Sequence, residues 1–387
     1  MTPNHPRVVM VNNSAETFTP SASGAIATWI WEVARAAQET GTTLTVLTGR
    51  AQESPYPWPD LRVLGPVIRP LGRPATLAER VVRRLLGWPT LRRWAYAHRV
   101  RRSLRDIPAG SLIVCHNDPE LATLLARSLT GVRVVHWFHN PILATDRWRR
   151  RYRKAPLRSV AVSRAVARAV ETLYVLGPLT VDSVLNGVDL ERFRPPATPP
   201  SGPPVISFAG RTGIEKGLDV LMTACLSLAP GRAFSLQIVG TNHWGHQTDD
   251  DYQQQLNALT RRLNDAGIVV ARLGHVTRDA LPSALQACHI HVVPSRWDEP
   301  ASLSILEGMA IGLASVATAT GGSPELLGEA GALIPRDDPE ALAVALTDLL
   351  DDAGHCHRRG EDARRRAEAF PWSVVWQRIS AFTTPWP

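Results

Sequence analysis

Long apolar runs are absent from this chain of 387 residues, and cysteines are few. No apolar run approaches the ~20 residues that a membrane-spanning helix needs. Residues 1–7 are polar and lead directly into a short apolar stretch, so the sequence predicts no signal peptide. The four cysteines lie far apart, without metal-ligand spacing, and we expect them to be reduced. These absences predict a cytoplasmic protein with no metal site.

Lysine is also scarce. Lysine and arginine together number 43, but only Lys154 and Lys216 are lysines, and the net charge is +8. The arginine bias is typical of a GC-rich genome rather than of a particular chemistry. A need for a compact point charge would explain Lys216, although a single lysine is also compatible with chance.

The order of expected strands and helices predicts two α/β domains. At the N-terminus, a strand at 8–12, a helix that opens at Gly24 and a strand at 43–47 form a βαβ unit, which implies a parallel sheet. A segment with six prolines in ten residues, 195–204, cannot be helix or central strand and predicts a semi-rigid linker. We therefore expect domains at 1–194 and 205–369.

Each domain has its own series of expected elements. The first continues with strands at 112–115, 132–137, 159–162 and 181–185 and a helix at 163–173. The second has strands at 205–209, 234–239, 269–273, 290–293, 315–317 and 332–334, with helices at 217–229, 252–266, 278–288 and 302–311. This rhythm is that of a doubly wound parallel sheet.

Two acids stand at the turn after the strand 290–293. Glu299 lies in the loop, and Glu307 follows on a helix that Ser302 or Ser304 would cap. Backbone N–H groups at such a helix start are a natural seat for phosphate. The alternative is a capping box from Ser304 to Glu307, in which Glu307 bonds only to its own backbone. The stretch alone favours neither.

A glycine-containing loop opens the second domain. Arg211 and Lys216 flank it, and Gly210, Gly213 and Gly217 give it flexibility. Two cations beside a loop that leads into a helix have the layout of a phosphate clamp. The loop is not a P-loop, because it lacks Gly-Lys-Ser/Thr.

Polar residues follow two strands of the first domain. His116 to Asp118 follow one, and His139 follows the other. The carboxyl ends of parallel strands face the crevice where ligands bind, which makes His139 a candidate site residue. A lone histidine is more often structural, and the glycine at Gly24 is equally compatible with a simple turn.

Two segments of the first domain are strongly basic. Residues 80–105 hold nine arginines and no acid, with tryptophans interleaved and Pro89 dividing the segment into two short helices. A second cluster lies at 147–154. Basic helices with tryptophan suit an anionic membrane surface or an anionic acceptor, and no nucleic-acid-binding motif is present. A solvated basic face is about as good an explanation.

Taken in order, these motifs resemble those of the retaining glycosyltransferases of family 4. The matching pieces are Gly210-Arg-x4-Lys216-Gly, Pro294-Ser-x3-Glu299-Pro with Glu307 eight positions later, Gly308-Met-Ala-x-Gly312, Gly321-Gly-x-Pro-Glu325, Val162-Ser163 and Asn186-Gly-Val-Asp-x3-Phe193-x-Pro195. They span nearly the whole chain, and this favours a functional role for Glu307.

The resemblance implies the GT-B fold, two Rossmann-like domains that face each other across a cleft, with a C-terminal helix, 370–387, that completes the first domain. It also implies transfer of a hexose from a UDP- or GDP-sugar. It implies no metal or other cofactor. The acceptor would be a glycan or a lipid-linked acceptor of bacterial cell-envelope or exopolysaccharide synthesis, reached from the cytoplasm or its membrane face. The site residues that it implies are Gly24, His139, Gly210, Arg211, Lys216, Glu299, Ala301, Ser302, Leu303 and Glu307, of which His139, Arg211, Lys216 and Glu299 would be catalytic.

The chain departs from the family pattern at two places. Ala301-Ser302 stands where the family usually has Phe-Gly, and Gly24-Ala25 stands where it usually has Gly-Gly. The first departure bears on the identity of the donor sugar. Two alternatives also remain: another GT-B enzyme, such as a sugar-nucleotide epimerase or a phosphorylase, and a catalytically weak subunit that binds a membrane or a partner through its arginines.

Overall fold

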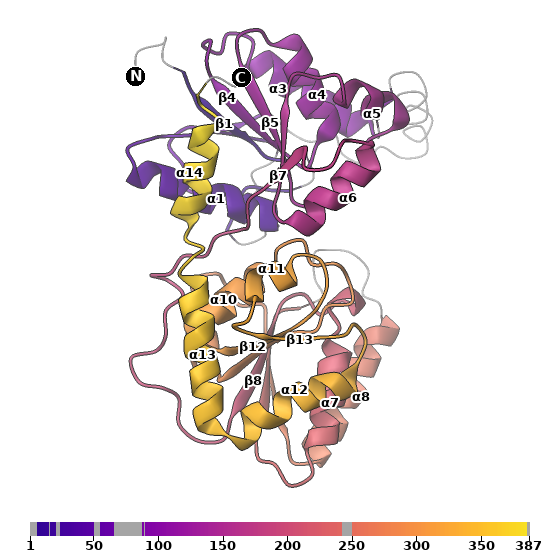
Figure 1. Ribbon diagram of the computed structural model, residues 1–387, viewed down its shortest axis with the longest axis vertical. Coiled ribbons are helices and arrows are strands. Elements are labelled where there is room, and N and C mark those ends of the chain that lie inside the picture. The colour runs from indigo at the N-terminus through magenta and orange to yellow at the C-terminus, as the bar shows by residue number, and fades with distance from the viewer. Residues whose placement is uncertain are drawn as a thin grey trace. The chain divides into compact units, whose positions relative to one another are not determined.

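The computed structural model describes residues 6–14, 16–20, 24–49, 55–65, 87–88, 90–241 and 250–384. The chain divides into two compact units, Met1–Leu185 with Trp372–Pro387, and Asn186–Pro371. Each unit is a parallel sheet with helices packed against it (Figure 1). The expected α/β class with two Rossmann-like sheets is confirmed.

The first unit contains a seven-stranded sheet in the order β3-β2-β1-β4-β5-β6-β7. Its strands are β1 (Val8–Val11), β2 (Thr45–Thr48), β3 (Leu61–Val63), β4 (Leu112–His116), β5 (Arg133–Phe138), β6 (Arg158–Ala161) and β7 (Val181–Ser183). The central strands β1 and β4 are buried along their whole length, which explains why their residues are apolar apart from His116 at the end of β4.

Helices of the first unit connect these strands. They are α1 (Ala25–Glu39), α3 (Leu91–Ser103), α4 (Pro119–Ser128), α5 (Asp146–Tyr152), α6 (Arg164–Tyr174) and the C-terminal α14 (Trp372–Ala381). Helix α14 packs on α1, where the indole Nε1 of Trp376 donates to Thr40 Oγ1 at 3.0 Å. The C-terminal helix therefore belongs to the first unit.

The second unit contains a six-stranded sheet in the order β10-β9-β8-β11-β12-β13. The strands are β8 (Val205–Ala209), β9 (Ser235–Val239), β10 (Val269–Gly274), β11 (Ile290–Val293), β12 (Ala314–Thr318) and β13 (Ala332–Ile334). The helices are η2 (Ile214–Lys216, a 3₁₀ turn), α7 (Leu218–Leu228), α8 (Asp250–Asp265), α9 (Leu281–Gln286), α10 (Leu303–Ile311), α11 (Ser323–Leu327), α12 (Pro339–Asp351) and α13 (Ala353–Ala367). Its core centres on buried apolar side chains such as Phe208, Leu221 and Val292.

The boundary between the units differs from the expected one. Residues 186–194, which we expected in the first domain, belong to the second unit. The Asn186 side chain donates to the Ala301 carbonyl at 2.7 Å, and Arg364 donates to the Phe193 carbonyl at 2.9 Å. These contacts hold the segment ahead of the proline-rich stretch against the second sheet.

The basic segment of the first unit is only partly described. Helix α3 begins at Leu91, where Thr90 accepts a hydrogen bond from the Arg93 N–H. The first of the two helices expected in 80–105 falls mostly at 80–86 and 89, which lie outside the described residues. None of the described helices has both the length and the apolar character that a membrane crossing needs.

Candidate active site

The loop between β11 and α10 carries the first candidate acid. Strand β11 is fully buried, and Ser302 ends the loop by accepting the Ile305 N–H at the start of α10. Glu299 lies within this loop and is 5% exposed. A nearly buried carboxylate beside a capped helix start requires partners, because an unpaired buried charge is costly.

Lys216 provides the main partner. Its Nζ lies 2.6 Å from Glu299 Oε1, and the Ser295 hydroxyl donates to the same oxygen at 2.5 Å. The two charged residues are 83 positions apart in the chain. Two sequence-predicted site residues are therefore in direct contact, and Ser295 joins them as a residue that the sequence reasoning had not singled out.

Glycines bring backbone close to this pair. Gly217 has a φ of +65°, and a Cβ there would lie 2.0 Å from the Pro294 carbonyl oxygen. Gly321 has a φ of +54°, and a Cβ there would lie 2.1 Å from the Glu299 carbonyl oxygen. The Gly322 N–H donates to that same carbonyl at 2.7 Å. The glycine motifs thus allow two loops to close on the segment that holds Glu299.

The second acid is not part of a capping box. Glu307 is 5% exposed, and its Oε1 accepts from Arg278 Nη2 at 2.7 Å. Ser304, the other half of the expected box, donates instead to the Ala209 carbonyl at 2.7 Å. Because both side chains have other partners, the capping-box alternative is wrong, and Arg278 is a further residue that sequence reasoning missed.

Arg211 lies apart from this pair in its contacts. It forms an ion pair with Glu215 at 2.9 Å, and its side chain is 51% exposed. Gly210 is held by its N–H, which donates to the Val239 carbonyl at 2.9 Å. The described contacts thus bring Lys216 to Glu299 but do not bring Arg211 to either, and its role as half of a clamp stays a prediction.

The remaining donor-side residues form the start of α10. Ala301 is buried, its carbonyl accepts from Asn186, and Leu303 is the first residue of the helix. Their proposed contact with a donor stays a prediction. Within the described ranges, no group of three or more histidine, cysteine or acidic residues has the geometry of a metal site.

In the first unit, His139 follows β5 and is 6% exposed. Its Nε2 lies 3.0 Å from His116 Nδ1, a nitrogen-to-nitrogen hydrogen bond between neighbouring strands. Burial lowers the pKa of His139 to about 3, so the ring is neutral at physiological pH. A neutral imidazole both donates and accepts hydrogen bonds, as a group that contacts sugar hydroxyls must.

Gly24 caps α1, but a carboxylate occupies the space in front of it. Glu16 Oε2 accepts the Ala27 N–H at 3.0 Å, and a Cβ on Gly24 would lie 2.3 Å from Glu16 Cδ. Gly24 therefore leaves room for Glu16, whose negative charge suits a helix N-terminus. A ligand contact at Gly24 stays a prediction.

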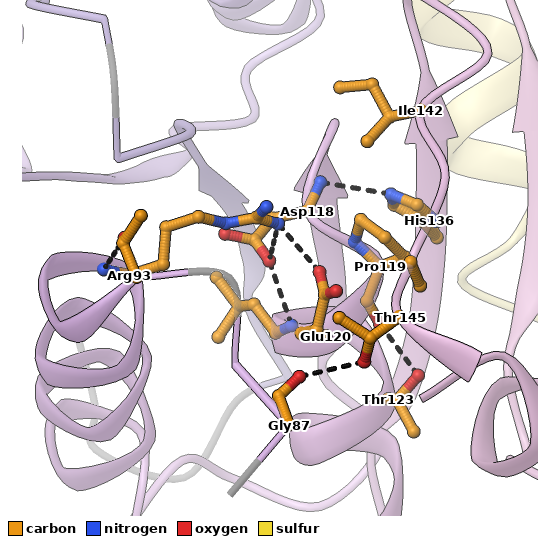
Figure 2. A network of polar contacts seen from close by, with 12 residues as sticks. Gly87, Arg93, Asp118, Pro119, Glu120, Thr123, His136, Ile142 and Thr145 are labelled. Atoms are coloured by element: carbon orange, nitrogen blue, oxygen red, sulfur yellow. Dashed lines mark hydrogen bonds and ion pairs between the residues drawn. The ribbon is translucent and has the colours of Figure 1, made fainter. Parts of the chain in front are cut away.

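Part of the basic segment is used inside the first unit. Arg93 Nη2 lies 2.9 Å from Asp118 Oδ1 and 2.7 Å from Glu120 Oε2, and Figure 2 shows the guanidinium reaching both carboxylates. Burial raises the pKa of Glu120 to about 7, although Arg93 opposes the rise. Arg93 therefore supplies a cation to two buried acids at the start of α4, a use that neither interpretation of the basic segment included.

Comparison with protein families matches each unit separately. Residues 26–192 match the model described as Glycosyltransferase Family 4, and residues 203–352 match the model described as Glycosyl transferases group 1. Together the two matches cover nearly the whole of both sheets.

Individual relatives are distant. The chain is 24% identical over 307 residues to the spore coat protein SA of Bacillus subtilis, covering 74% of this chain and 80% of that one. It is 28% identical over 400 residues to D-inositol 3-phosphate glycosyltransferase 1 of Catenulispora acidiphila, covering 93% and 90%. HepE of Anabaena, solved in complex with UDP and glucose, has a TM-score of 0.71 at 18% identity, with 97% of this chain and 99% of that chain covered. At that identity the structural likeness shows the GT-B fold alone.

Proposed function

This chain belongs to glycosyltransferase family 4, and we propose that it transfers a hexosyl unit, with retention of configuration, from a UDP- or GDP-sugar to a glycan or lipid-linked acceptor. We place this reaction in bacterial cell-envelope or exopolysaccharide synthesis, on the cytoplasmic side. The observation that carries the proposal is the Lys216–Glu299 pair, with Nζ and Oε1 2.6 Å apart beside the start of α10.

The proposed donor site uses charges that are already assembled. The diphosphate would accept from the backbone N–H groups at the start of α10 and from Lys216, which exchanges Glu299 for a phosphate oxygen. Glu299, released from Lys216, would contact the hydroxyls of the donor sugar. Arg211 would join from its exposed position by leaving Glu215, because a diphosphate attracts it more strongly than one carboxylate does.

Glu307 has the properties of a ribose-binding carboxylate. Arg278 holds one of its oxygens at 2.7 Å, which fixes the side chain. The second oxygen would accept from a ribose hydroxyl, a charge-assisted hydrogen bond of about 1.5 to 3 kcal/mol. HepE, a structural neighbour, was solved with UDP. A nucleoside-diphosphate ligand for this chain is part of the proposal.

Catalysis would rest on electrostatics rather than on a metal. As the glycosidic bond breaks, charge grows on the β-phosphate, and a fixed ammonium stabilises that charge more than it stabilises the bound donor. The leaving phosphate would then help to deprotonate the acceptor hydroxyl on the same face of the sugar. This front-face displacement gives retention without a protein nucleophile, with neutral His139 bonding a sugar hydroxyl.

A panel of nucleotide sugars tests the donor. Binding to the folded state adds RT ln(1 + [L]/Kd), about 2.7 kcal/mol at a hundred times Kd, so the true donor should give the largest rise in melting temperature. With that donor, release of free nucleoside diphosphate should require an acceptor, and NMR of the product should show the donor's anomeric configuration. Turnover should survive excess EDTA.

The alternatives give different results in the same experiment. An epimerase would convert the donor with no acceptor present, and a phosphorylase would need inorganic phosphate. A catalytically weak subunit would bind no nucleotide sugar. Any of these outcomes, or an inverted product, would overturn the proposed reaction.

A further inference from the structure

A pair of buried histidines in the first unit has a geometry that the general reaction does not explain. His116 is the last residue of β4, and His139 directly follows β5, its parallel neighbour in the sheet. The His116 Nδ1 and His139 Nε2 atoms lie 3.0 Å apart. His116 is fully buried and has no access to a substrate of its own, so any role must pass through His139.

Aromatic packing fixes both rings. The Trp29 ring meets the His116 ring edge-on at 4.9 Å and the His139 ring at 5.3 Å between centroids. Trp137 lies beside Trp29 at 5.0 Å and pairs with His116 in the sheet register. Because Trp29 packs against both rings, neither imidazole can turn away without leaving a void in a packed core.

The backbone of His139 is held as firmly as its ring. Asn117, which follows His116, has a φ of +49°. Its Oδ1 accepts the N–H groups of His139 at 2.7 Å and Asn140 at 3.2 Å, while its own N–H donates to the Trp137 carbonyl at 3.1 Å. Two consecutive residues at the end of β4 therefore hold the ring and the main chain of His139.

A hydrogen bond between two neutral imidazoles couples their tautomers. Burial is the main cause that lowers the pKa of both histidines, so neither ring is charged near neutral pH. One of the two bonded nitrogens must carry a proton and the other must not. The tautomer of His116 thus decides whether His139 Nδ1 is a hydrogen-bond donor or an acceptor.

The surroundings of His116 favour one of these tautomers. Its Nε2 is buried, and no partner for it exists among the described residues. The nearby indole N–H groups of Trp29 and Trp137 also find no acceptor there. An unprotonated Nε2 fits these surroundings, because a proton on it would add a third buried N–H group without an acceptor. The proton of His116 then lies on Nδ1.

We propose that His116 is a positioning residue for the transfer reaction: its Nδ1–H donates to His139 Nε2 and fixes His139 as the tautomer that presents an N–H at Nδ1. That N–H would donate to a hydroxyl of the transferred sugar or of the acceptor. The inference rests on the proposed function, in which His139 contacts substrate, and it adds the residue that decides the direction of that hydrogen bond.

Two substitutions at His116 separate positioning from folding. The amide of His116→Asn keeps an N–H donor near the place of Nδ1, whereas His116→Leu removes it. We expect His116→Leu to lower kcat about 10-fold, as loss of a group that orients a functional histidine does elsewhere, with donor KM nearly unchanged. His116→Asn should recover most of this loss. If both variants fail equally, or if His116→Leu keeps the parent kcat, the proposal is wrong.

A double variant and a matched control test the path through His139. His116→Leu should have little effect on kcat in a His139→Ala background, because the contact is already absent. His136→Leu removes another fully buried ring of β5, whose nitrogens bond to the Asp118 N–H and to Tyr152 Oη rather than to His139. It should lower thermal stability without this pattern of rescue. Full additivity of His116→Leu and His139→Ala would contradict the proposal.

Nitrogen NMR distinguishes failure of this inference from failure of the proposed function. In ring-¹⁵N-labelled parent protein, His116 Nδ1 and His139 Nδ1 should each show a bonded proton, and His139 Nε2 should show none. The opposite pattern overturns the tautomer whether or not turnover is found. If transfer occurs and His139→Ala retains the parent kcat, the inference and the proposed contact of His139 with the sugar fail, while the proposed transfer reaction stands.

Discussion

The candidate residues of the two units differ in charge. In the second unit, opposite charges are paired, with Lys216 on Glu299 and Arg278 on Glu307. In the first unit, the candidate is one of two buried neutral rings, His116 and His139. The cation of an ion pair can leave its carboxylate and bind a phosphate. A neutral ring can bind a hydroxyl group without the cost of removing water from a charge. In the proposed reaction, the paired charges of the second unit would bind the donor's diphosphate, sugar and ribose, and neutral His139 would bind a sugar hydroxyl.

The largest predicted effect tests whether the second unit works by charge. Lys216→Ala should slow single-turnover transfer by a factor that corresponds to roughly 2 to 4 kcal/mol of lost transition-state stabilisation, as removal of a preorganised donor does. Lys216→Arg should not restore the rate, because a planar guanidinium cannot replace a compact ammonium beside Gly217, where backbone is already close. Donor affinity should fall less than the rate.

The chain's other lysine provides the matched control. Lys154 is exposed just after α5, and Lys154→Ala removes the same charge from the surface. It should leave the rate with a soluble acceptor unchanged. Near-normal turnover in Lys216→Ala would show that the phosphate is neutralised by another group and would break the comparison between the two units.

The second prediction concerns the folding stability that the buried, neutral histidine rings cost at low pH. Burial lowers the pKa of His136 and His139 to about 3, and it also lowers the pKa of His116 well below its usual range. Their folded pKa values lie below the unfolded value of about 6.5, so the unfolded chain binds more protons as pH falls through that value. The first unit should therefore lose stability from pH 6.5 downward.

The second unit supplies the reference for that measurement. In that unit, burial lowers the pKa of His291 to about 4. At pH 5 each neutral histidine should cost roughly 1 to 2 kcal/mol of folding stability. Protonation of Glu120, with a pKa raised by burial to about 7, offsets part of this loss in the first unit. Hydrogen exchange, corrected for intrinsic rates, should show β4 and β5 losing more protection than β8 and β9, and equal losses would contradict the prediction.

Local patterns predicted most of the fold. Strands β8, β11 and β13 have the predicted bounds, because each is a short apolar run closed by turn residues. Helix α4 was missed although Asp118 caps it and Pro119 begins it, a signal that was available in the sequence. Helix α5 was missed because its arginines hide the apolar period that marks a helix.

The site was predictable only where a motif reports a contact between distant residues. No local pattern connects Lys216 to Glu299, and the family resemblance placed both in one site. Arg278 has no such signal, since its contact with Glu307 depends on how separate segments pack. Ser295 and residues 186–194 lie in motifs of the family, but the motifs do not say that Ser295 bonds to Glu299 or that Asn186 and Phe193 have partners in the second unit.

The third prediction separates the two acids of the second unit. Glu307→Gln should raise the donor KM by a factor that corresponds to about 1 to 2 kcal/mol of lost binding free energy, because a neutral amide is a poorer acceptor for ribose hydroxyls. Glu299→Gln should lower kcat more than it raises KM, since Glu299 would act nearer the reacting carbon. Steady-state kinetics with the true donor measures both.

Helix stability is the control for this pair. Ser302, not Glu307, caps α10, so Glu307→Gln should leave the melting temperature nearly unchanged. Equal and trivial kinetic effects of the two substitutions would remove Glu307 from the donor site, and the charged pairs of the second unit would then be structural.

The smallest predicted effect concerns the basic surface of the first unit. The exposed arginines of this surface are not among the candidate site residues. Arg101 and Arg102 are exposed on α3, and each arginine near an anionic membrane contributes about 1 kcal/mol. Replacing both by Ser should weaken binding to anionic liposomes at low salt, and added salt should weaken the parent in the same way. Arg93→Ser should instead lower stability, because it would leave Asp118 and Glu120 without their cation. A parent that ignores anionic liposomes at low salt would assign the exposed arginines to solvation and favour a soluble acceptor.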